Sequence, residues 1–254
     1  MSKESSVSGI LKSLRDQALS SKCRLLDRQP QLDRPILTIF ECFFCLPSKS
    51  YFLDLPLKNI CALSHHNFFE TGQTWREILY PTREKSGLTC QGWSSGVFNY
   101  FDGEWRDNLF SQYAENCMGG ARFTAIGGAV VVTNGMHRVA GGYVYRAAQQ
   151  GENAVFSKVR IRHCELMPEV KKFLENLDSS LGIFISKSEI ACPRFWITDY
   201  IQITARGLVT LRRLSPFNGL FGKKKMQQLS PDLLSCILND TFLNATESAP
   251  PYDE

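Results

Sequence analysis

The clearest pattern of hydrophobic and polar positions lies in the middle of the chain. The apolar run 129–132 is stopped by Thr133-Asn134-Gly135, and residues 136–150 are typical of a helix. The pattern therefore predicts a strand, a tight turn and a helix in this order. Gly135 fits the turn, because glycine lets the backbone bend sharply and come close to a ligand.

Other stretches carry strand or helix patterns of their own. Ile10, Leu11, Leu14 and Ala18 fall at helical spacing and predict an amphipathic helix, either laid on the domain surface or gripping a partner. Strands are predicted at 35–45, 51–57, 122–126, 154–164, 182–186 and within 195–214, the first two as a hairpin. Helices are predicted at 74–79, 104–116, 168–177 and 231–243, while 59–63 begins a helix or a loop.

Composition and charge exclude few classes of protein. With 43% hydrophobic and 21% charged residues, the 254-residue chain is ordinary for a globular protein, and its net charge of +4 permits a nucleic-acid partner without requiring one. The longest apolar run is interrupted by Glu41 and is too short to span a bilayer, so we expect no membrane segment. The nine cysteines are odd in number and follow a polar N-terminus, so we expect reduced thiols in a cytoplasmic protein.

The predicted turn has the features of a phosphate-binding site. The first turn of a helix has free N–H groups and the positive end of the helix dipole, which attract an anion. His137 and Arg138 lie there and would add one tunable and one permanent positive charge, which also makes them the candidate catalytic residues. We therefore expect phosphate to bind at Asn134, Gly135, Met136, His137 and Arg138. The alternatives are a capping or core histidine and a salt bridge from the arginine to a nearby acid.

The order of elements around the turn resembles the ParB/sulfiredoxin superfamily. The strand is followed by Asn134-Gly135-Met136-His137-Arg138-Val139-Ala140, then by a helix, Gly151 and a new strand. This is similar to the family's Gly-x-His-Arg or Gly-Glu-Arg-Arg element. Residues 51–63, YFLDLPLKNICAL, also resemble the family's opening strand with its x-Pro-Leu-x-x-Ile pattern, so the resemblance covers residues 50–164.

With this resemblance we expect an α/β (α+β) protein with a ParB/sulfiredoxin-like mixed-sheet core. We expect a helical arm at 1–34, the core at 35–166 with an insertion near 80–110, an α+β extension at 167–243 and a disordered tail at 244–254. The resemblance implies a phosphate pocket formed by the turn backbone and the His-Arg pair. The family includes sulfiredoxins, CTP-hydrolysing partition clamps, a free-serine kinase and proposed nucleases.

The chain departs from two branches of this family. Met136 stands where sulfiredoxins carry the catalytic cysteine, and a thioether is a poor nucleophile, so we expect no sulfinate repair. Val139 stands where the partition clamps carry a second arginine.

Basic residues on one predicted strand form a second candidate site. Lys158, Arg160 and Arg162 alternate with apolar residues along 154–164 and, with Phe156, take one face of the strand. Such a stripe is either a solvated face or a surface that contacts a nucleic-acid backbone.

Few other residues have the spacing of a metal or acid–base site. Cys42 and Cys45 have zinc-ligand spacing without a second Cys/His pair, so we expect buried thiols and no protein-held metal. The acids that could supply a general base or hold Mg²⁺ are Glu70, Glu77, Glu104 and Asp107. Gly141 and Gly142, inside the predicted helix, favour close packing of that helix on its sheet.

The sequence leads to two functions from different classes. The first is a nucleotide- or phosphoester-binding protein that, if it is an enzyme, acts as a phosphotransferase, nucleotide hydrolase or nuclease, with Mg²⁺ accompanying the nucleotide. The second is a non-catalytic module that has kept the fold and grips DNA, RNA or a protein partner. The lost cysteine and the unassigned general base favour the second, and the oligomeric state stays open.

Overall fold

The computed structural model describes most of the chain, and the remaining residues are not discussed. The described residues are 3–30, 45–64, 68–106, 110–115, 119–176, 183–186, 194–197, 201–203, 209–211, 226–229 and 231–243. Residues 35–44 of the strand predicted at 35–45, the Cys42 thiol and the predicted tail at 244–254 therefore lie outside the described residues.

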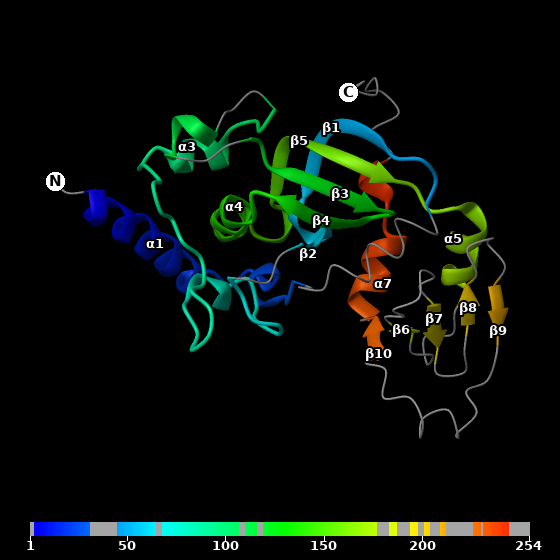
Figure 1. The fold of residues 1–254 in the computed structure, drawn as a ribbon. Coiled ribbons are helices and arrows are strands. Elements are labelled where there is room, and N and C mark those ends of the chain that lie inside the picture. The colour runs from blue at the N-terminus through cyan, green and yellow to red at the C-terminus, as the bar shows by residue number, and fades with distance from the viewer. Residues whose placement is uncertain are drawn as a thin grey trace.

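A five-stranded mixed sheet forms the centre of the protein (Figure 1). Its strands, in the order β1-β5-β3-β4-β2, are β1 Lys49–Pro56, β5 Val155–Cys164, β3 Arg122–Ile126, β4 Ala129–Asn134 and β2 Ile60–Leu63. The pairs β1–β5 and β3–β4 are antiparallel, while β5–β3 and β4–β2 are parallel. The expected α/β class with a mixed sheet is confirmed.

Helices cover both faces of this sheet. They are α1 Lys3–Ser20, α3 Val97–Asp102, α4 Met136–Gln150, α5 Pro168–Glu175 and α7 Pro231–Leu238. Short 3-10 helices occur at Arg24–Asp27, Leu57–Asn59, Glu77–Leu79, Phe110–Gln112 and Gly151–Asn153. On one face α4 packs between the sheet, α1 and α3, and on the other α7 packs against β4 and α5 (Figure 1).

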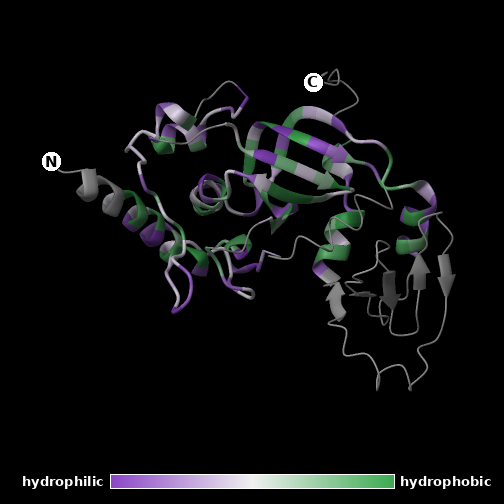
Figure 2. Cartoon of the chain, viewed as in Figure 1, coloured by the Kyte–Doolittle hydropathy of each residue, from purple (hydrophilic) through white to green (hydrophobic). Residues whose placement is uncertain are grey.

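The apolar run of β4 is explained by this layering. Val130 and Val132 point into the core under α4, while Ala129 and Val131 point into the core under α7. Because the strand is buried on both faces, it is hydrophobic at successive positions rather than at alternate ones. Both β4 and α7 are largely hydrophobic in Figure 2.

The N-terminal helix is part of the domain. Ile10, Leu14 and Ala18 are buried, and α1 contacts α4. The prediction of a helix laid on the domain surface is therefore confirmed. Within the described part of the chain, no helix has the length and apolar character needed to cross a membrane.

The two glycines in α4 are explained by close packing, but mostly against aromatic side chains outside the sheet rather than on the sheet as the sequence predicted. A Cβ atom on Gly141 would lie 2.9 Å from the Trp93 ring, and one on Gly142 would lie 3.0 Å from the Phe101 ring. The helix can approach the aromatic side chains of the 64–118 region only because both side chains are absent.

Two short sheets follow α5. One has the order β10-β6-β7 with antiparallel pairs, and the other pairs β8 with β9. Their strands are β6 Ile183–Ser186, β7 Arg194–Ile197, β8 Ile201–Ile203, β9 Val209–Leu211 and β10 Met226–Leu229.

Four predictions of secondary structure were wrong or too coarse. Of the helix predicted at 74–79, only the 3-10 helix Glu77–Leu79 forms. Residues 60–63 form strand β2 instead of beginning a helix or a loop, and α7 ends at Leu238 rather than at residue 243. The helix predicted at 104–116 is absent from its described residues, where Glu104 bridges to Ser157 and a short 3-10 helix begins at Phe110. The reason is aromatic packing: Trp105 and Phe110 are both buried against Tyr100, which a continuous helix would not allow.

Candidate functional site

The turn between β4 and α4 is a tight glycine turn, as the sequence predicted. Gly135 adopts a left-handed conformation, with φ of 74° and ψ of 31°, and caps the N-terminus of α4. A Cβ atom there would lie 2.8 Å from the Nε atom of Arg138. Glycine is therefore required both for the backbone angle and for the arginine that folds back over the turn.

Arg138 is buried and held by neutral groups. Its Nη1 atom donates to the carbonyl of Gly119 at 2.8 Å, and its guanidinium lies 4.6 Å from the centre of the Phe110 ring. Burial raises the pKa of the nearby Tyr100 to about 12, and the positive charge of Arg138 opposes this shift. Among the described residues no carboxylate forms an ion pair with Arg138, so the salt bridge considered as an alternative is not seen there.

The backbone at the start of α4 offers hydrogen-bond donors. The first bond of the helix runs from the N–H of Val139 to the carbonyl of Gly135 at 2.9 Å. In the part of the chain that the structure describes, nothing accepts from the N–H groups of Met136, His137 or Arg138. These three groups lie at the positive end of a 15-residue helix.

The other two predicted residues shape the turn. The Asn134 amide donates to the carbonyl of Gly120 at 2.9 Å, which fixes the loop before β3 against the turn. The side chain of Met136 is buried, with its sulfur 3.9 Å from the Ser64 hydroxyl. Met136 can therefore contribute only its backbone N–H to a ligand.

His137 does not carry the positive charge that the sequence suggested. Its Nδ1 atom accepts a hydrogen bond from the N–H of Thr89 at 3.2 Å, and its ring packs against Phe68 with 4.0 Å between ring centres. Burial lowers its pKa from 6.5 to about 4, so the ring is neutral near pH 7. With Nδ1 as the acceptor, the ring proton resides on Nε2, which stays a hydrogen-bond donor.

The basic strand is exposed, but its face differs from the predicted one. Lys158, Arg160 and Arg162 are exposed, whereas Phe156 is fully buried. The cause is a bulge in the β1–β5 pairing: Lys158 has a φ of 51°, and its N–H donates to the Asp54 carboxylate at 3.0 Å. This bulge shifts the alternation of buried and exposed side chains along β5. Phe156, before the bulge, therefore points to the opposite face from Arg160 and Arg162, after it.

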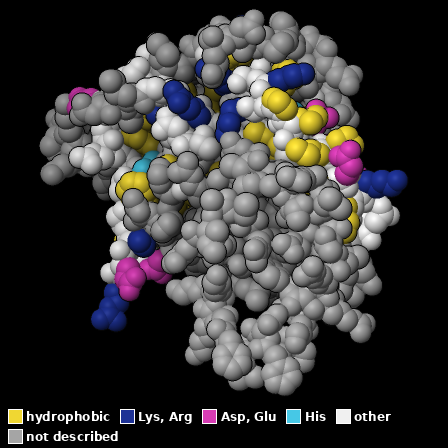
Figure 3. All heavy atoms as spheres, turned by 45° about the vertical axis from the view of Figure 1, so that its right-hand side comes forward, with side chains coloured by type: hydrophobic (Ala, Val, Ile, Leu, Met, Phe, Trp, Pro, Cys, Tyr) yellow, Lys and Arg dark blue, Asp and Glu magenta, His cyan; other side chains and the backbone are white. Residues whose placement is uncertain are grey.

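Strand register brings the basic residues toward the turn. Phe123 pairs with Ile161 in the parallel β3–β5 ladder, which places Arg160 level with Arg122. Arg122 in turn pairs with Asn134, the residue before Gly135. Figure 3 shows several Lys and Arg side chains gathered in the upper part of one face of the described surface.

The acids considered as general bases have partners elsewhere. The carboxylate of Glu70 accepts a hydrogen bond from Thr82, and that of Glu77 accepts from the N–H and hydroxyl of Thr74. The backbone of Glu104 pairs with Ser157 of β5. Asp107 lies outside the described residues.

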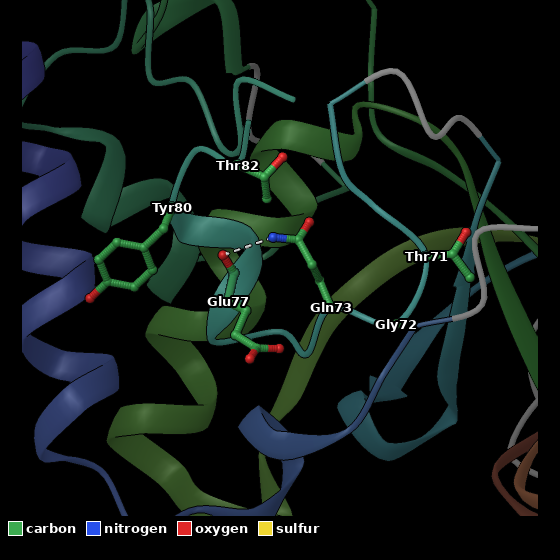
Figure 4. A pocket seen from close by; sticks show the side chains of 6 residues that line it. All are labelled: Thr71, Gly72, Gln73, Glu77, Tyr80 and Thr82. Carbon is green, nitrogen blue, oxygen red and sulfur yellow. Dashed lines mark hydrogen bonds between the residues drawn. The ribbon is translucent and has the colours of Figure 1, made fainter. Parts of the chain in front are cut away.

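A cavity of about 450 Å³ lies beside Glu77 (Figure 4). It is lined by Thr71, Gly72, Gln73, Glu77, Tyr80 and Thr82, none of which belongs to the turn. The Gln73 amide is directed at the backbone carbonyl of Glu77, 3.4 Å away. Gln73 thus closes its own loop, and we assign this cavity no chemistry.

Sequence reasoning missed the residues that support the turn. Thr89, Tyr100 and Phe110 all lie at the predicted site, and all come from the irregular region before β3. Their only signal was the high density of aromatic residues and glycine at 64–118.

The expectations for the cysteines and for metal ligands can be checked only among the described residues. The six described cysteines are Cys23, Cys45, Cys61, Cys90, Cys164 and Cys236, and none of them forms a disulfide. No three His, Cys, Asp or Glu side chains within the described ranges are grouped as metal ligands would be. Sequence reasoning also missed that Cys61, Cys236 and Arg28 lie together, because no local motif joins them.

Comparison with known proteins gives no relative: no family model, curated protein or solved structure matches this chain.

Proposed function

We propose that this protein binds a phosphorylated ligand, a nucleotide or another phosphoester, at the turn before α4. The proposal rests on hydrogen-bond donors and a positive charge at one place. Among the described residues, nothing accepts a hydrogen bond from the N–H groups of Met136, His137 and Arg138. The buried guanidinium of Arg138 lies beside them and forms no ion pair with a described carboxylate. A phosphate placed there would accept from the N–H groups and offset the charge of Arg138. The resemblance of residues 134–140 to the ParB/sulfiredoxin superfamily favours the same class of ligand.

The contacts of His137 give it a different role from the one its sequence position suggested. As a neutral ring held by Thr89 and Phe68, it would donate from Nε2 to a phosphate oxygen instead of supplying charge. Arg138 would then be the permanent positive charge of the site, and the backbone would supply the remaining donors.

The proposal concerns ligand binding and assigns no catalytic step. The carboxylates of Glu70 and Glu77 have hydrogen-bond partners away from the turn, and only the backbone of Glu104 is seen to pair, so none of the three is assigned as a general base. Hydrolysis or phosphoryl transfer, with Mg²⁺ bound to the nucleotide, would require a base from another part of the chain or from a substrate.

Calorimetry and thermal-shift measurements with ATP, CTP and inorganic phosphate, with and without Mg²⁺, test the proposal. Arg138→Gln should weaken binding about tenfold or more, because it removes a charge-assisted contact in a buried setting. Arg146→Gln is the matched control, since Arg146 is also buried on α4 but bonds Val155 and Asp102 at the other end. Absence of binding by the wild-type protein at millimolar ligand, or equal effects of the two variants, would contradict the proposal.

A second candidate, nucleic-acid binding, is favoured by one observation. Lys158, Arg160 and Arg162 are exposed at alternate positions of β5. The pairing of β5 with β3 places Arg160 level with Arg122, which pairs with Asn134 next to the turn. Such a row can track a phosphate backbone without reading bases. In this case the turn before α4 would bind one backbone phosphate of the nucleic-acid strand that the basic residues contact.

A further inference from the structure

A pair of thiols and an arginine meet at a place far from the turn. Arg28 follows the 3-10 helix Arg24–Asp27, Cys61 lies in β2 and Cys236 lies in α7. The Nη2 atom of Arg28 donates to the Cys236 sulfur at 3.4 Å, across 208 positions of sequence, and its Nη1 atom donates to the Lys58 carbonyl. Three separate segments therefore build this group.

The frame around the thiols is fixed by buried hydrogen bonds. Asn59 is buried and donates to the carbonyl of Gly128 at 3.0 Å and to that of Asn239 at 3.2 Å. The N–H of Gly128 donates to the carbonyl of Ile237 at 2.9 Å. These bonds hold α7 against the start of β2, so the positions of the two thiols are determined by the fold.

The two thiols interact electrostatically, and one of them lines a cavity. Cys61 and Cys236 are both buried and are near enough to shift each other's pKa. The Cys61 sulfur lies 3.7 Å from the Val130 carbonyl oxygen, and the Cys236 sulfur lies 3.9 Å from that of Lys58. Cys236 also lines a cavity of about 370 Å³, together with Arg28, Lys58, Asn59 and Ser235. A small polar molecule in this cavity can reach the Cys236 sulfur, whereas Cys61 lies behind it in the sheet.

The charges around the pair make the two thiols different. Interaction with Cys61 and the positive charge of Arg28 lower the pKa of Cys236, against its burial and the nearby Asp232 carboxylate. Interaction with Cys236 and complete burial raise the pKa of Cys61. Cys236, which accepts the hydrogen bond of Arg28, is therefore the more acidic of the two thiols.

We propose that Cys236 is a reactive cysteine that a small hydroperoxide oxidises, and that Cys61 converts the product into a Cys61–Cys236 disulfide. In the first step the Cys236 thiolate attacks one peroxide oxygen, the O–O bond breaks, and the leaving oxygen takes a proton to become water or an alcohol. In the second step the Cys61 sulfur attacks the Cys236 sulfenic acid, the S–O bond breaks, and water leaves with the Cys61 proton. Two thiols are oxidised and one peroxide is reduced.

Peroxide titration of the native full-length chain, followed by peptide mass spectrometry, tests the proposal. The wild-type protein should lose two hydrogen atoms and show one Cys61–Cys236 cross-link. In Cys61→Ser the sulfenic acid has no resolving thiol, so dimedone should label Cys236. A cross-link between other cysteines, or no product at Cys236, would overturn the proposal.

An internal control needs no variant. Cys90 is also buried, and its burial raises its pKa to about 12. In competitive alkylation of the native protein at pH 7, Cys236 should react at least about tenfold faster than Cys90. Equal rates would overturn the proposal even if no variant folds.

The role of Arg28 is tested by Arg28→Gln. The variant should slow alkylation of Cys236 about tenfold at pH 7 and move the midpoint of its pH profile upward, because the thiolate loses its cation. Arg24→Gln, which changes an exposed arginine of the same 3-10 segment, should leave both values unchanged. An unchanged pH midpoint in Arg28→Gln would remove the arginine from the mechanism.

Discussion

The two ends of the β3–β4 hairpin carry similar glycine pairs but have opposite surroundings. At one end, a Cβ atom on Gly120 would meet nothing within 4 Å, and Gly119 faces only the Asn134 amide. At the other end, a Cβ atom on Gly128 would lie 1.9 Å from the carbonyl oxygen of Asn239. The first pair is open beside the Gly135 turn, and the second is closed by α7.

This difference teaches that glycine pairs do not by themselves mark a ligand site. Both pairs allow close approach of another group to the backbone, but at the closed end that group is the C-terminal end of α7. At the open end, the donors of α4 remain without a described acceptor. What distinguishes the two ends is the segment that packs over them, and that segment comes from a distant part of the chain.

The largest expected effect is at the closed end. Gly128→Ala should lower the free energy of unfolding by about 3 kcal/mol, because the added methyl group overlaps the α7 carbonyls. Gly120→Ala should change it by less than about 0.5 kcal/mol, since the space there is open. Urea denaturation of both variants gives the values, and similar losses would erase the distinction between the two ends.

A smaller loss is expected from the hydrogen bonds of the closed end. Asn59→Ala leaves the carbonyls of Gly128 and Asn239 without their buried donor, which should cost about 2 kcal/mol of stability. Asn153→Ala, at an exposed position, is the control and should be nearly neutral. If Asn59→Ala is as stable as the control, α7 is not held to the sheet by this amide.

At the open end, His137 should make stability depend on pH. Its pKa is about 4 in the folded protein and 6.5 ordinarily, so the unfolded chain binds more protons between these values. The contribution is fully present above pH 6.5 and is lost as the pH falls toward 4. His137→Gln should flatten this part of the stability profile in urea denaturation at stepped pH.

A second histidine supplies the control for that measurement. Burial also lowers the pKa of His163, which lies in β5 away from the turn. His163→Gln should remove only the contribution of His163 to the dependence of unfolding free energy on pH. The contribution of His137 should remain. A wild-type profile that does not change in His137→Gln would mean that the ring is already solvated.

The smallest effect concerns the basic strand beside the open end. Arg160→Glu should weaken binding to single- or double-stranded oligonucleotides about tenfold at low salt and reduce the salt dependence of binding. Lys172→Glu, an exposed position on α5, should change neither. Fluorescence anisotropy measures both, and no binding by the wild-type protein at low salt would leave only the small-ligand proposal.

The sequence predicted the local elements of this region better than their surroundings. The strand, the glycine turn and the helix from Met136 to Gln150 are confirmed, because each depends on neighbouring residues alone. Strand β2 was missed because a four-residue apolar run has no periodicity to separate strand from helix. The helix expected from Glu104 was wrong because aromatic packing overrides local propensity.

The same limit applies to the candidate sites. The tight turn expected at Gly135 follows from residue type, but the neutral state of His137 depends on Phe68 and Thr89, which no sequence pattern connects to it. The contact between Arg28 and Cys236 spans almost the whole chain. Pairings of this kind are set by tertiary structure and cannot be inferred from spacing.

The enclosure of α4 has a consequence for how the turn would respond to a ligand. Ten of the fifteen residues of α4 are buried, and the helix is packed against the sheet, α1 and α3. Its interior amide hydrogens should exchange with solvent only when the whole domain unfolds, whereas the three N–H groups at its start should exchange quickly. A bound phosphate would protect those three groups without moving the helix, so association would require no slow rearrangement of α4.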